Sequence, residues 1–388
     1  MDKEVTSHNR PLVGVIFGIN SKTLKEMDSY PRLKEIAKAN VEAKTTLIFF
    51  CSEDVDISKK RIKGTHYNFK TNRWEKKQFP FPDILYVRGG SGKEMDALLA
   101  EFDRLGIKRI NPIYAFNKGD LYELLDQDEN VRQYLPPTKN VQTMAQIRGM
   151  IREHGIVYVK ARRGRKGTQV MRIEKLRHNG YLYSYSILGY LVRKRVNTME
   201  NLQKAIKSFF GSRPMIVQRA IDLVRASNNR LCDFRAELQR NKQGEIDIVG
   251  VCIRVGQQGS PITTHSSAYR YNRYIKKVFP HYTNEQIEEL KENINRFLID
   301  IYIGVEEVYG RFGEIGIDFG VDRKGKIWLI ECNAQSAKVS IVKAYGEKAR
   351  IAFLNPLEYA KAIYGQPRFR LCSTETSAME TSKMPRDS

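Results

Sequence analysis

Three oxygen-bearing side chains near the end of the sequence have the types and spacing of a metal site. Asp318 lies in an alternating run, GIDFGV, and Glu331 and Asn333 end a second run, IWLIECN. The residues between the runs, DRKGK, are typical of a tight turn, so a β-hairpin is predicted. Glu331 and Asn333 would share a face, with Cys332 turned away. These oxygens suit Mg²⁺, which is commonly held by one or two carboxylates and substrate phosphates. Solvated polar residues at a strand end are the alternative.

Two lysines could bind phosphate. Lys118 stands in FNKGD, before an amphipathic helix, where a solvated lysine is the alternative. Lys160 ends a predicted strand, GIVYVK, and the basic loop ARRGRKGT follows it. Glycines free backbone N–H groups to surround a phosphate, and lysine adds a point charge. The loop lacks the pattern GxxxxGK[ST], so it is not a P-loop.

The charge distribution favours an anionic partner. The chain has a formal net charge of +22, and residues 160–195 contain eleven Lys and Arg but one acid, Glu174. Such a surface attracts nucleotides, nucleic acids or acidic macromolecules, and charge does not decide among them. The sequence has no zinc-finger or RNP-like pattern, so sequence-specific nucleic-acid binding is not expected.

Length and composition indicate a globular protein of two or three domains. The chain has 388 residues, 41% of them hydrophobic. No apolar run approaches the ~18 residues of a membrane-spanning helix, and the first residues, MDKEVTSHNRP, lack the apolar core of a signal peptide. The five cysteines are odd in number and widely spaced, which predicts neither zinc nor disulfides. Synthesis and folding in the cytoplasm are therefore expected.

The elements that must position these residues can be predicted in outline. Apolar runs predict an N-terminal α/β domain with strands at 11–17, 44–51 and 83–87 and helices at 21–40 and 93–105. Residues 52–80 are polar and are expected to be irregular. The glycine cluster at 88–92 is interpreted as a strand-to-helix turn rather than a phosphate loop. Later strands are expected at 155–160, 169–173, 214–221, 232–238 and 246–255, and helices at 198–210, 284–308 and 356–363.

The order of these features resembles that of the ATP-grasp superfamily. Within it, FNKxxxYxLL, YLPPT, QRAIDL and ECNAQS resemble the YheC/YheD family of endospore coat-associated proteins. The resemblance extends over about residues 10–365. It implies an ATP-grasp fold, of the α+β and α/β classes, in which two α+β lobes clamp ATP after an N-terminal α/β domain. The implied divisions are residues 1–110, an N-terminal lobe at 111–212 and a C-terminal lobe with the Mg²⁺ site at 213–368. A disordered tail is expected at 369–388, because its last residues, STETSAMETSKMPRDS, lack a core pattern.

The resemblance also implies a role for each candidate residue. Lys118 and Lys160 would contact the nucleotide phosphates, and a loop with Gly164, Gly167 and Thr168 would close over them. Gln218, Arg219 and Ile221 would line the adenine, and Asp222 would reach the ribose. Asp318, Glu331 and Asn333 would hold Mg²⁺. Arg235 and Arg254 would face the γ-phosphate and the acyl-phosphate, and His265 and Ser266 would border the acceptor substrate, where a loop histidine with a purely structural role is equally compatible.

The implied activity is an ATP-dependent, ADP-forming carboxylate–amine ligase acting through an acyl-phosphate. Two departures bear on it: Gln218 stands where many relatives carry an acid, and AQSAK follows Asn333 where many ligases carry a proline-glycine pair. Two other functions stay open: a non-catalytic spore-coat scaffold that uses its basic surface to dock on acidic coat components, and a kinase that stops at phosphoryl transfer.

Overall fold

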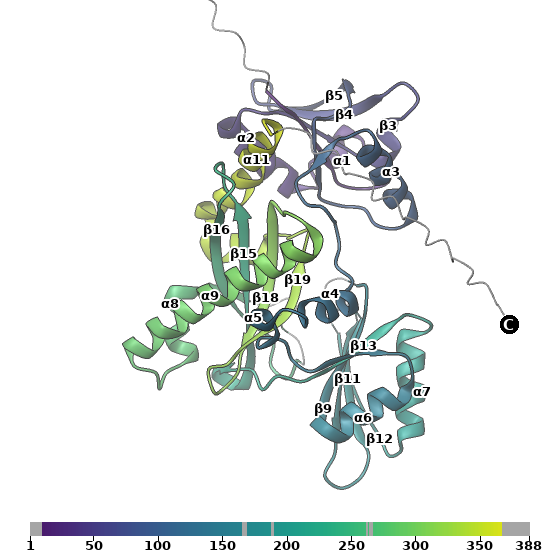
Figure 1. The fold of residues 1–388 in the computed structure, drawn as a ribbon, viewed down its shortest axis with the longest axis vertical. Helices are drawn as coiled ribbons and strands as arrows, with labels where there is room; N and C mark the ends of the chain where they lie inside the picture. The colour runs from purple at the N-terminus through teal and green to yellow at the C-terminus, as the bar shows by residue number, and fades with distance from the viewer. Residues whose placement is uncertain (1–9, 165–168, 188–189, 261–262, 264–266, 367–388) are drawn as a thin grey trace, which may run out of the picture.

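Three β-sheets follow one another along the chain (Figure 1). The structure is a computed structural model, and it describes residues 10–164, 169–187, 190–260, 263 and 267–366. We call the sheets the N-terminal, middle and C-terminal sheets. In the described part of the chain, no helix is long and apolar enough to cross a membrane.

The N-terminal sheet has helices on both faces. Its strand order is β3-β4-β2-β1-β6-β7, with β5 added to β4, and β2, β1, β6 and β7 are parallel. Helix α2 packs on one face and α3 on the other, which is the layered arrangement that alternating strands and helices predict. The elements are β1 (Leu12–Ile16), α1 (Leu24–Met27), α2 (Pro31–Ala43), β2 (Thr46–Phe50), β3 (Val55–Asp56), β4 (Arg61–Asn68), β5 (Arg73–Pro80), β6 (Ile84–Val87), α3 (Lys93–Arg104) and β7 (Lys108–Arg109).

The expectation that residues 52–80 are irregular is wrong. Strands β4 and β5 form a long antiparallel hairpin there, from Arg61 paired with Pro80 to Asn68 paired with Arg73. The two ends of the hairpin pack on opposite faces of the sheet: Ile62 lies in the core with α3 and Trp74 in the core with α2, and many of the residues between them are exposed. Because the buried residues change face along the hairpin, the sequence keeps a polar average composition without a simple alternation.

The middle sheet is antiparallel, with strand order β12-β11-β10-β9-β13-β8. Helices α6 and α7 bury Ile147, Met150, Leu202 and Ile206 against one face of it. The opposite face carries Lys160 and Gln218. The elements are β8 (Thr138–Val141), α6 (Met144–His154), β9 (Ile156–Ala161), β10 (Val170–Lys175), β11 (Tyr181–Ile187), β12 (Tyr190–Val196), α7 (Met199–Phe210) and β13 (Met215–Arg219).

The C-terminal sheet has strand order β17-β16-β15-β18-β19, with the short β14 paired to β15. The long helix α9 covers one face through Phe297, Leu298 and Ile301, which pack on Phe234 and Phe319. Along each strand, polar residues stand between these core residues, and their side chains point to the opposite face of the C-terminal sheet. The elements are β14 (Arg225–Ala226), β15 (Arg230–Arg240), β16 (Ile246–Val255), β17 (Ser267–Arg270), α8 (Tyr271–Val278), α9 (Asn284–Tyr309), β18 (Glu314–Val321) and β19 (Ile327–Asn333).

Two groups of helices connect the sheets. Helices α4 (Lys118–Leu125) and α5 (Glu129–Arg132) pack on α9, and in Figure 1 α4 lies between the C-terminal and middle sheets. After β19 come α10 (Val339–Tyr345) and α11 (Ile351–Tyr364). Helix α11 returns to the N-terminal sheet, where Phe353, Leu357 and Ile363 share a core with Leu33 and Ile36 of α2. The predicted division into 1–110, 111–212 and 213–368 stays a prediction.

Candidate functional site

The β18–β19 hairpin brings the predicted metal ligands to one face. Asp318 lies directly opposite Glu331, and Gly316 lies opposite Asn333. Cys332 is buried in the core on the other face. The hairpin and the shared face of Glu331 and Asn333 are as the alternation of the sequence predicts.

A β-bulge changes the pattern at one position. Phe319 pairs with Leu329 but Asp318 pairs with Glu331, so Ile330 is extra. As a result Leu329 and Cys332, three residues apart, both face the core. The alternation also turns Trp328 to the side of Arg219, whose guanidinium lies 4.8 Å from the Trp328 ring centroid. Bulges commonly re-aim side chains beside functional sites in this way.

Two arginines converge on Asp318. Arg235 Nη1 donates to Asp318 Oδ1 at 2.8 Å, and Arg254 Nη2 lies 3.2 Å from the same oxygen. Neighbouring strands impose this arrangement, because Arg235 of β15 pairs directly with Asp318 of β18. Burial raises the pKa of Asp318, but the two guanidinium groups outweigh it and hold that pKa below its usual value. Asp318 is therefore an ionised carboxylate.

A second layer of contacts orients these arginines. Arg254 makes a bidentate pair with Asp233, with Nε to Oδ1 at 2.7 Å and Nη2 to Oδ2 at 2.6 Å. Arg235 Nη2 donates to Ser336 Oγ at 2.8 Å, and Ser336 in turn donates to Glu237. The AQSAK loop is thus tied to an arginine of the site by Ser336. Bidentate and charge-assisted contacts of this kind fix a guanidinium firmly.

Lys118 connects three parts of the site. It is the first residue of α4, after the N-cap Asn117, and its Nζ lies 2.9 Å from Glu331 Oε1 and 3.2 Å from the carbonyl oxygen of Gly164. Its backbone N–H donates to the Arg162 carbonyl oxygen at 2.8 Å. A lysine on a helix start thus reaches both the basic loop and the predicted metal ligands.

Lys160 lies on the face of the middle sheet that is opposite α6 and α7, and it is close to Lys118 of α4. Its Nζ donates to Gln218 Oε1 at 2.6 Å, and Gln218 Nε2 donates to Thr138 Oγ1 at 2.8 Å. Burial lowers the pKa of Lys160 to about 8; Lys118 also lowers it, whereas Glu331 and Asp318 oppose the change. Gln218 offers a neutral amide, so among the described residues of the middle sheet this lysine forms no ion pair.

The segment after β13 crosses from the middle sheet to the C-terminal sheet. The Arg219 N–H pairs with the Pro137 carbonyl oxygen at 2.9 Å, and the Ile221 carbonyl oxygen accepts from Leu223 N at 2.9 Å. Asp222 is exposed and lies 3.3 Å from Arg323 Nε. Arg219 and Ile221 therefore lie where the two sheets meet, and Asp222 lies at the solvent. Their nucleotide roles stay predictions.

The donor set at the hairpin fits a hard cation. No three His, Cys, Asp or Glu side chains gather as a metal site within the described residues. A cation would therefore use the two carboxylates of Asp318 and Glu331, the amide oxygen of Asn333 and the phosphates. Asn333 Nδ2 lies 3.4 Å from the Gly316 carbonyl oxygen, so this weak contact occupies the nitrogen and not the oxygen.

Four predicted residues lie outside the described part of the chain: Gly167, Thr168, His265 and Ser266. Three residues that the prediction omitted belong to the site: Trp328, Thr138 and Ser336. The orientation of the Trp328 side chain depends on the bulge. Thr138 lies 80 residues from Gln218 in the sequence, and the pairing of their strands brings the two side chains together. Ser336 stands in the AQSAK loop. The difference between this loop and the ligase pattern is the only feature of the sequence that pointed to Ser336.

Comparisons with known proteins agree with this geometry. The profile of the YheC/D-like ATP-grasp family matches residues 106–363. The endospore coat-associated proteins YheD and YheC of Bacillus subtilis (strain 168) are 23% and 21% identical to this chain; each alignment covers 86% of this chain, with 74% of YheD and 92% of YheC.

Solved structures show the same fold. The VanG D-Ala:D-Ser ligase of Enterococcus faecalis superposes with a TM-score of 0.54 and 15% identity, covering 92% of this chain and 99% of that one. The D-cycloserine synthetase DcsG superposes with a TM-score of 0.54 and 13% identity, covering 90% and 99%. The chain therefore has the ATP-grasp fold that its sequence pattern resembles.

Proposed function

Since this chain belongs to the YheC/D-like ATP-grasp family, we propose that it is an ATP-dependent ligase that joins a carboxylate to an amine and releases ADP and phosphate. One observation carries the proposal. Lys118, Lys160, Arg235 and Arg254 converge on the carboxylates of Asp318 and Glu331 from four different elements. Such a mixture of cations and metal-type ligands suits the phosphates of Mg-ATP.

The reaction proceeds in two displacements. A carboxylate oxygen of the first substrate attacks the γ-phosphorus, the bond to the β-γ bridging oxygen breaks, and ADP leaves. The amine nitrogen of the second substrate then attacks the acyl carbon, phosphate departs with its bonding electrons, and the nitrogen loses a proton. No covalent enzyme intermediate is required.

The residues of this chain bind and orient the groups that react. Lys118 and Lys160 hold phosphate oxygens, and Lys118 exchanges its present partner Glu331 for the nucleotide. Arg254, fixed by Asp233, and Arg235, fixed by Ser336, stabilise the negative charge of the transferring phosphoryl group. Asp318, Glu331 and Asn333 would hold Mg²⁺, which when bound neutralises phosphate charge. A single preorganised donor of this kind contributes about 3 kcal/mol to transition-state stabilisation.

A second candidate is a coat scaffold that retains the fold without turnover. The net charge of +22 favours it, since a basic surface can dock on acidic coat components. Conversely, a scaffold has no need for paired arginines on Asp318. Cytoplasmic synthesis followed by association with the forming spore coat fits either candidate.

Calorimetry with Mg-ATP tests the nucleotide site. We expect micromolar binding that collapses in Glu331→Ala/Asn333→Ala. The matched control is Glu292→Ala/Asn295→Ala, which removes the same side-chain types from exposed positions of α9 and should bind like the parent. Loss of binding in both variants, or binding that persists in the first, would contradict the proposed site.

Product analysis then separates the activities. ADP release that requires both a carboxylate and an amine supports the ligase. A stable phosphorylated product formed without an amine would assign a kinase, and ATP binding without turnover across a broad panel of carboxylate and amine pairs would assign the scaffold.

A further inference from the structure

The middle sheet ends in an exposed strand. In the described part of the structure, β12 pairs only with β11, so its outer edge has no strand partner. Along this edge Arg193, Lys194 and Arg195 are exposed, and Tyr190 and Leu191 are 78% and 43% exposed. An unpaired edge offers a row of backbone N–H and C=O groups to any strand that can approach.

The same edge carries positive charge without carboxylates nearby in sequence. From Lys175 to Met199 the sequence contains no Asp or Glu. Among the described residues, no ion pair involves Lys175, Arg177, Arg193, Lys194 or Arg195. By contrast, Arg172 on the neighbouring β10 is paired with Glu174 at 2.8 Å. Within the part of the chain that the structure describes, no carboxylate compensates the charge at this edge.

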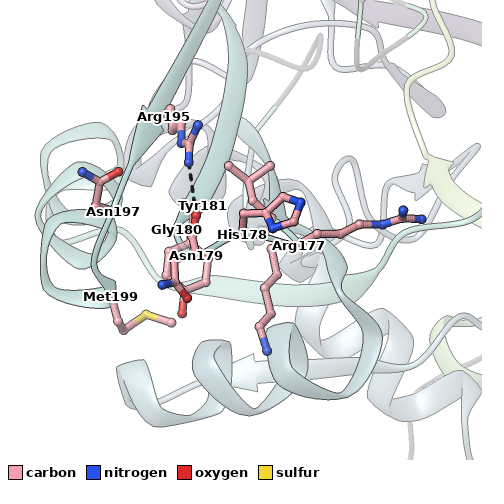
Figure 2. A pocket seen from close by; sticks show the side chains of 10 residues that line it. Arg177, His178, Asn179, Gly180, Tyr181, Arg195, Asn197 and Met199 are labelled. Atoms are coloured by element: carbon pink, nitrogen blue, oxygen red, sulfur yellow. Dashed lines mark hydrogen bonds between the residues drawn. The ribbon is translucent and has the colours of Figure 1, made fainter.

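A cleft of about 700 Å³ lies at the end of this strand, around the turn between β10 and β11 (Figure 2). Its lining includes Lys175, Arg177, His178 and Arg195. Figure 2 shows Arg195 reaching from β12 toward the turn, and its Nη2 lies 3.5 Å from the Asn179 carbonyl oxygen. The edge of β12 and the cleft thus share Arg195 and form one surface.

We propose that this surface binds an extended acidic polypeptide, which pairs its backbone with β12 and places acidic side chains on Arg193, Arg195 and the cleft. Arg193 and Arg195 are two residues apart and share one face of the strand. A partner strand with an acid at every second position would match them, because residues directly opposite each other on neighbouring strands interact.

The chemistry of the surface selects against other occupants. A second copy of this chain would place like charges opposite one another, which is destabilising. A nucleic acid would use the charges but not the backbone groups of β12, nor the apolar flank formed by Ile187, Tyr190 and Leu191. An acidic strand uses all three features.

The surface is separate from the nucleotide site and the proposal goes beyond the proposed function. Strands β11 and β10 lie between β12 and the strand that carries Lys160, a distance on the order of 14 Å at the usual strand spacing. Peptide binding and ATP binding can therefore fail independently.

The test measures fluorescence anisotropy of a labelled octapeptide of alternating Glu and Val with the full chain. We expect binding that weakens by at least about tenfold in Arg193→Glu/Arg195→Glu and in the parent when every Glu of the peptide becomes Gln. The matched control is Lys63→Glu/Arg73→Glu, the same change of charge on exposed strand positions of the N-terminal sheet; its affinity should stay within about twofold.

Equal loss in the control variant would show that only net charge matters and would overturn the proposal. Single-stranded RNA of eight nucleotides binding this surface more tightly than the peptide would overturn it in favour of a nucleic-acid surface. Circular dichroism verifies folding, and Arg193→Gln/Arg195→Gln replaces the charge reversal if that variant unfolds.

Backbone pairing has a test of its own. Two peptides are N-methylated at alternate residues, one at the odd and one at the even positions. Because only every second residue of an added strand turns its N–H toward β12, one peptide should bind and the other should not. Equal binding by both would exclude strand addition.

Discussion

Lys160 is a cation kept in surroundings that disfavour its charge. Burial is the main reason that its pKa falls to about 8. Because the fold favours the neutral form, the contribution of Lys160 to the free energy of unfolding is present above its ordinary pKa of 10.5 and is lost as the pH falls through 8. A bound phosphate would supply the negative charge that the neutral Gln218 does not.

The affinity for Mg-ATP should therefore fall as the pH rises through about 8, by up to about tenfold per pH unit, since a neutral lysine does not attract phosphate. Calorimetry from pH 7 to pH 9 measures this change. Lys160→Met should bind more weakly and show a flatter profile. If the variant and the parent lose affinity in parallel, another group causes the pH dependence.

Helix α4 begins at a point where the chain has little room. A Cβ atom on Gly119 would lie 2.2 Å from Asn140 Oδ1 and 2.5 Å from Arg162 Nε. The close approach holds the start of the helix against β8 and against Arg162, which directly follows the strand that carries Lys160, and Lys118 is the residue next to Gly119. The position of Lys118 thus depends on a glycine.

Gly119→Ala should lower the free energy of unfolding by about 1–3 kcal/mol, as overpacking commonly does, and should weaken Mg-ATP binding by displacing Lys118. Denaturant unfolding and calorimetry measure the two effects. The matched control is Gly149→Ala in α6, where an added Cβ meets no atom within 4 Å. That variant should gain up to about 1 kcal/mol from helix propensity and bind normally. Unchanged ATP binding by Gly119→Ala would remove the link between this glycine and Lys118.

Local periodicity predicted the elements whose patterns are complete within a few residues. The turn DRKGK and the alternation around it were enough to place Asp318, Glu331 and Asn333 on one face. The bulge at Ile330 interrupts the period of two without a signal in the sequence, and the contact of Thr138 with Gln218 depends on pairing between segments 80 residues apart. The strands at 61–80 were not predicted because their buried side chains change face along the hairpin, and those at 181–196 because they are polar on average and packed mainly on one side.

At the scale of the whole molecule, a buried ionic cluster joins the N-terminal sheet to the C-terminal sheet. Glu314 of β18 accepts from Tyr86 Oη at 2.9 Å and pairs with Arg88 and Lys338. The side chains of Glu314 and Lys338 are 0% and 1% exposed. Burial raises the pKa of Glu314, but Lys338 and Arg88 outweigh it and hold the pKa below its usual value of 4.5. The contribution of the cluster is therefore present above pH 4.5 and is lost as the pH falls through the lower, folded-state value.

Glu314→Gln should lower the free energy of unfolding by about 3–5 kcal/mol, because it leaves two buried cations without a carboxylate. Denaturant unfolding at pH 7 measures the loss. The control is Glu42→Gln, which breaks an exposed pair of Glu42 with Arg350 at 3.0 Å and should change stability by less than about 1 kcal/mol. Similar effects in the two variants would show that burial does not govern these pairs.

The packing of α11 on α2 has a consequence for synthesis on the ribosome. Residues 351–364 complete the core of a sheet whose strands end at Arg109. Until about 240 further residues have been made, the N-terminal sheet lacks α11, and the apolar face of α2 stays uncovered. At about 5–20 residues per second this interval is at least about 10 seconds. The part of the chain that is made first is thus among the last to be finished, and during that interval it exposes apolar surface of the kind that leads to aggregation.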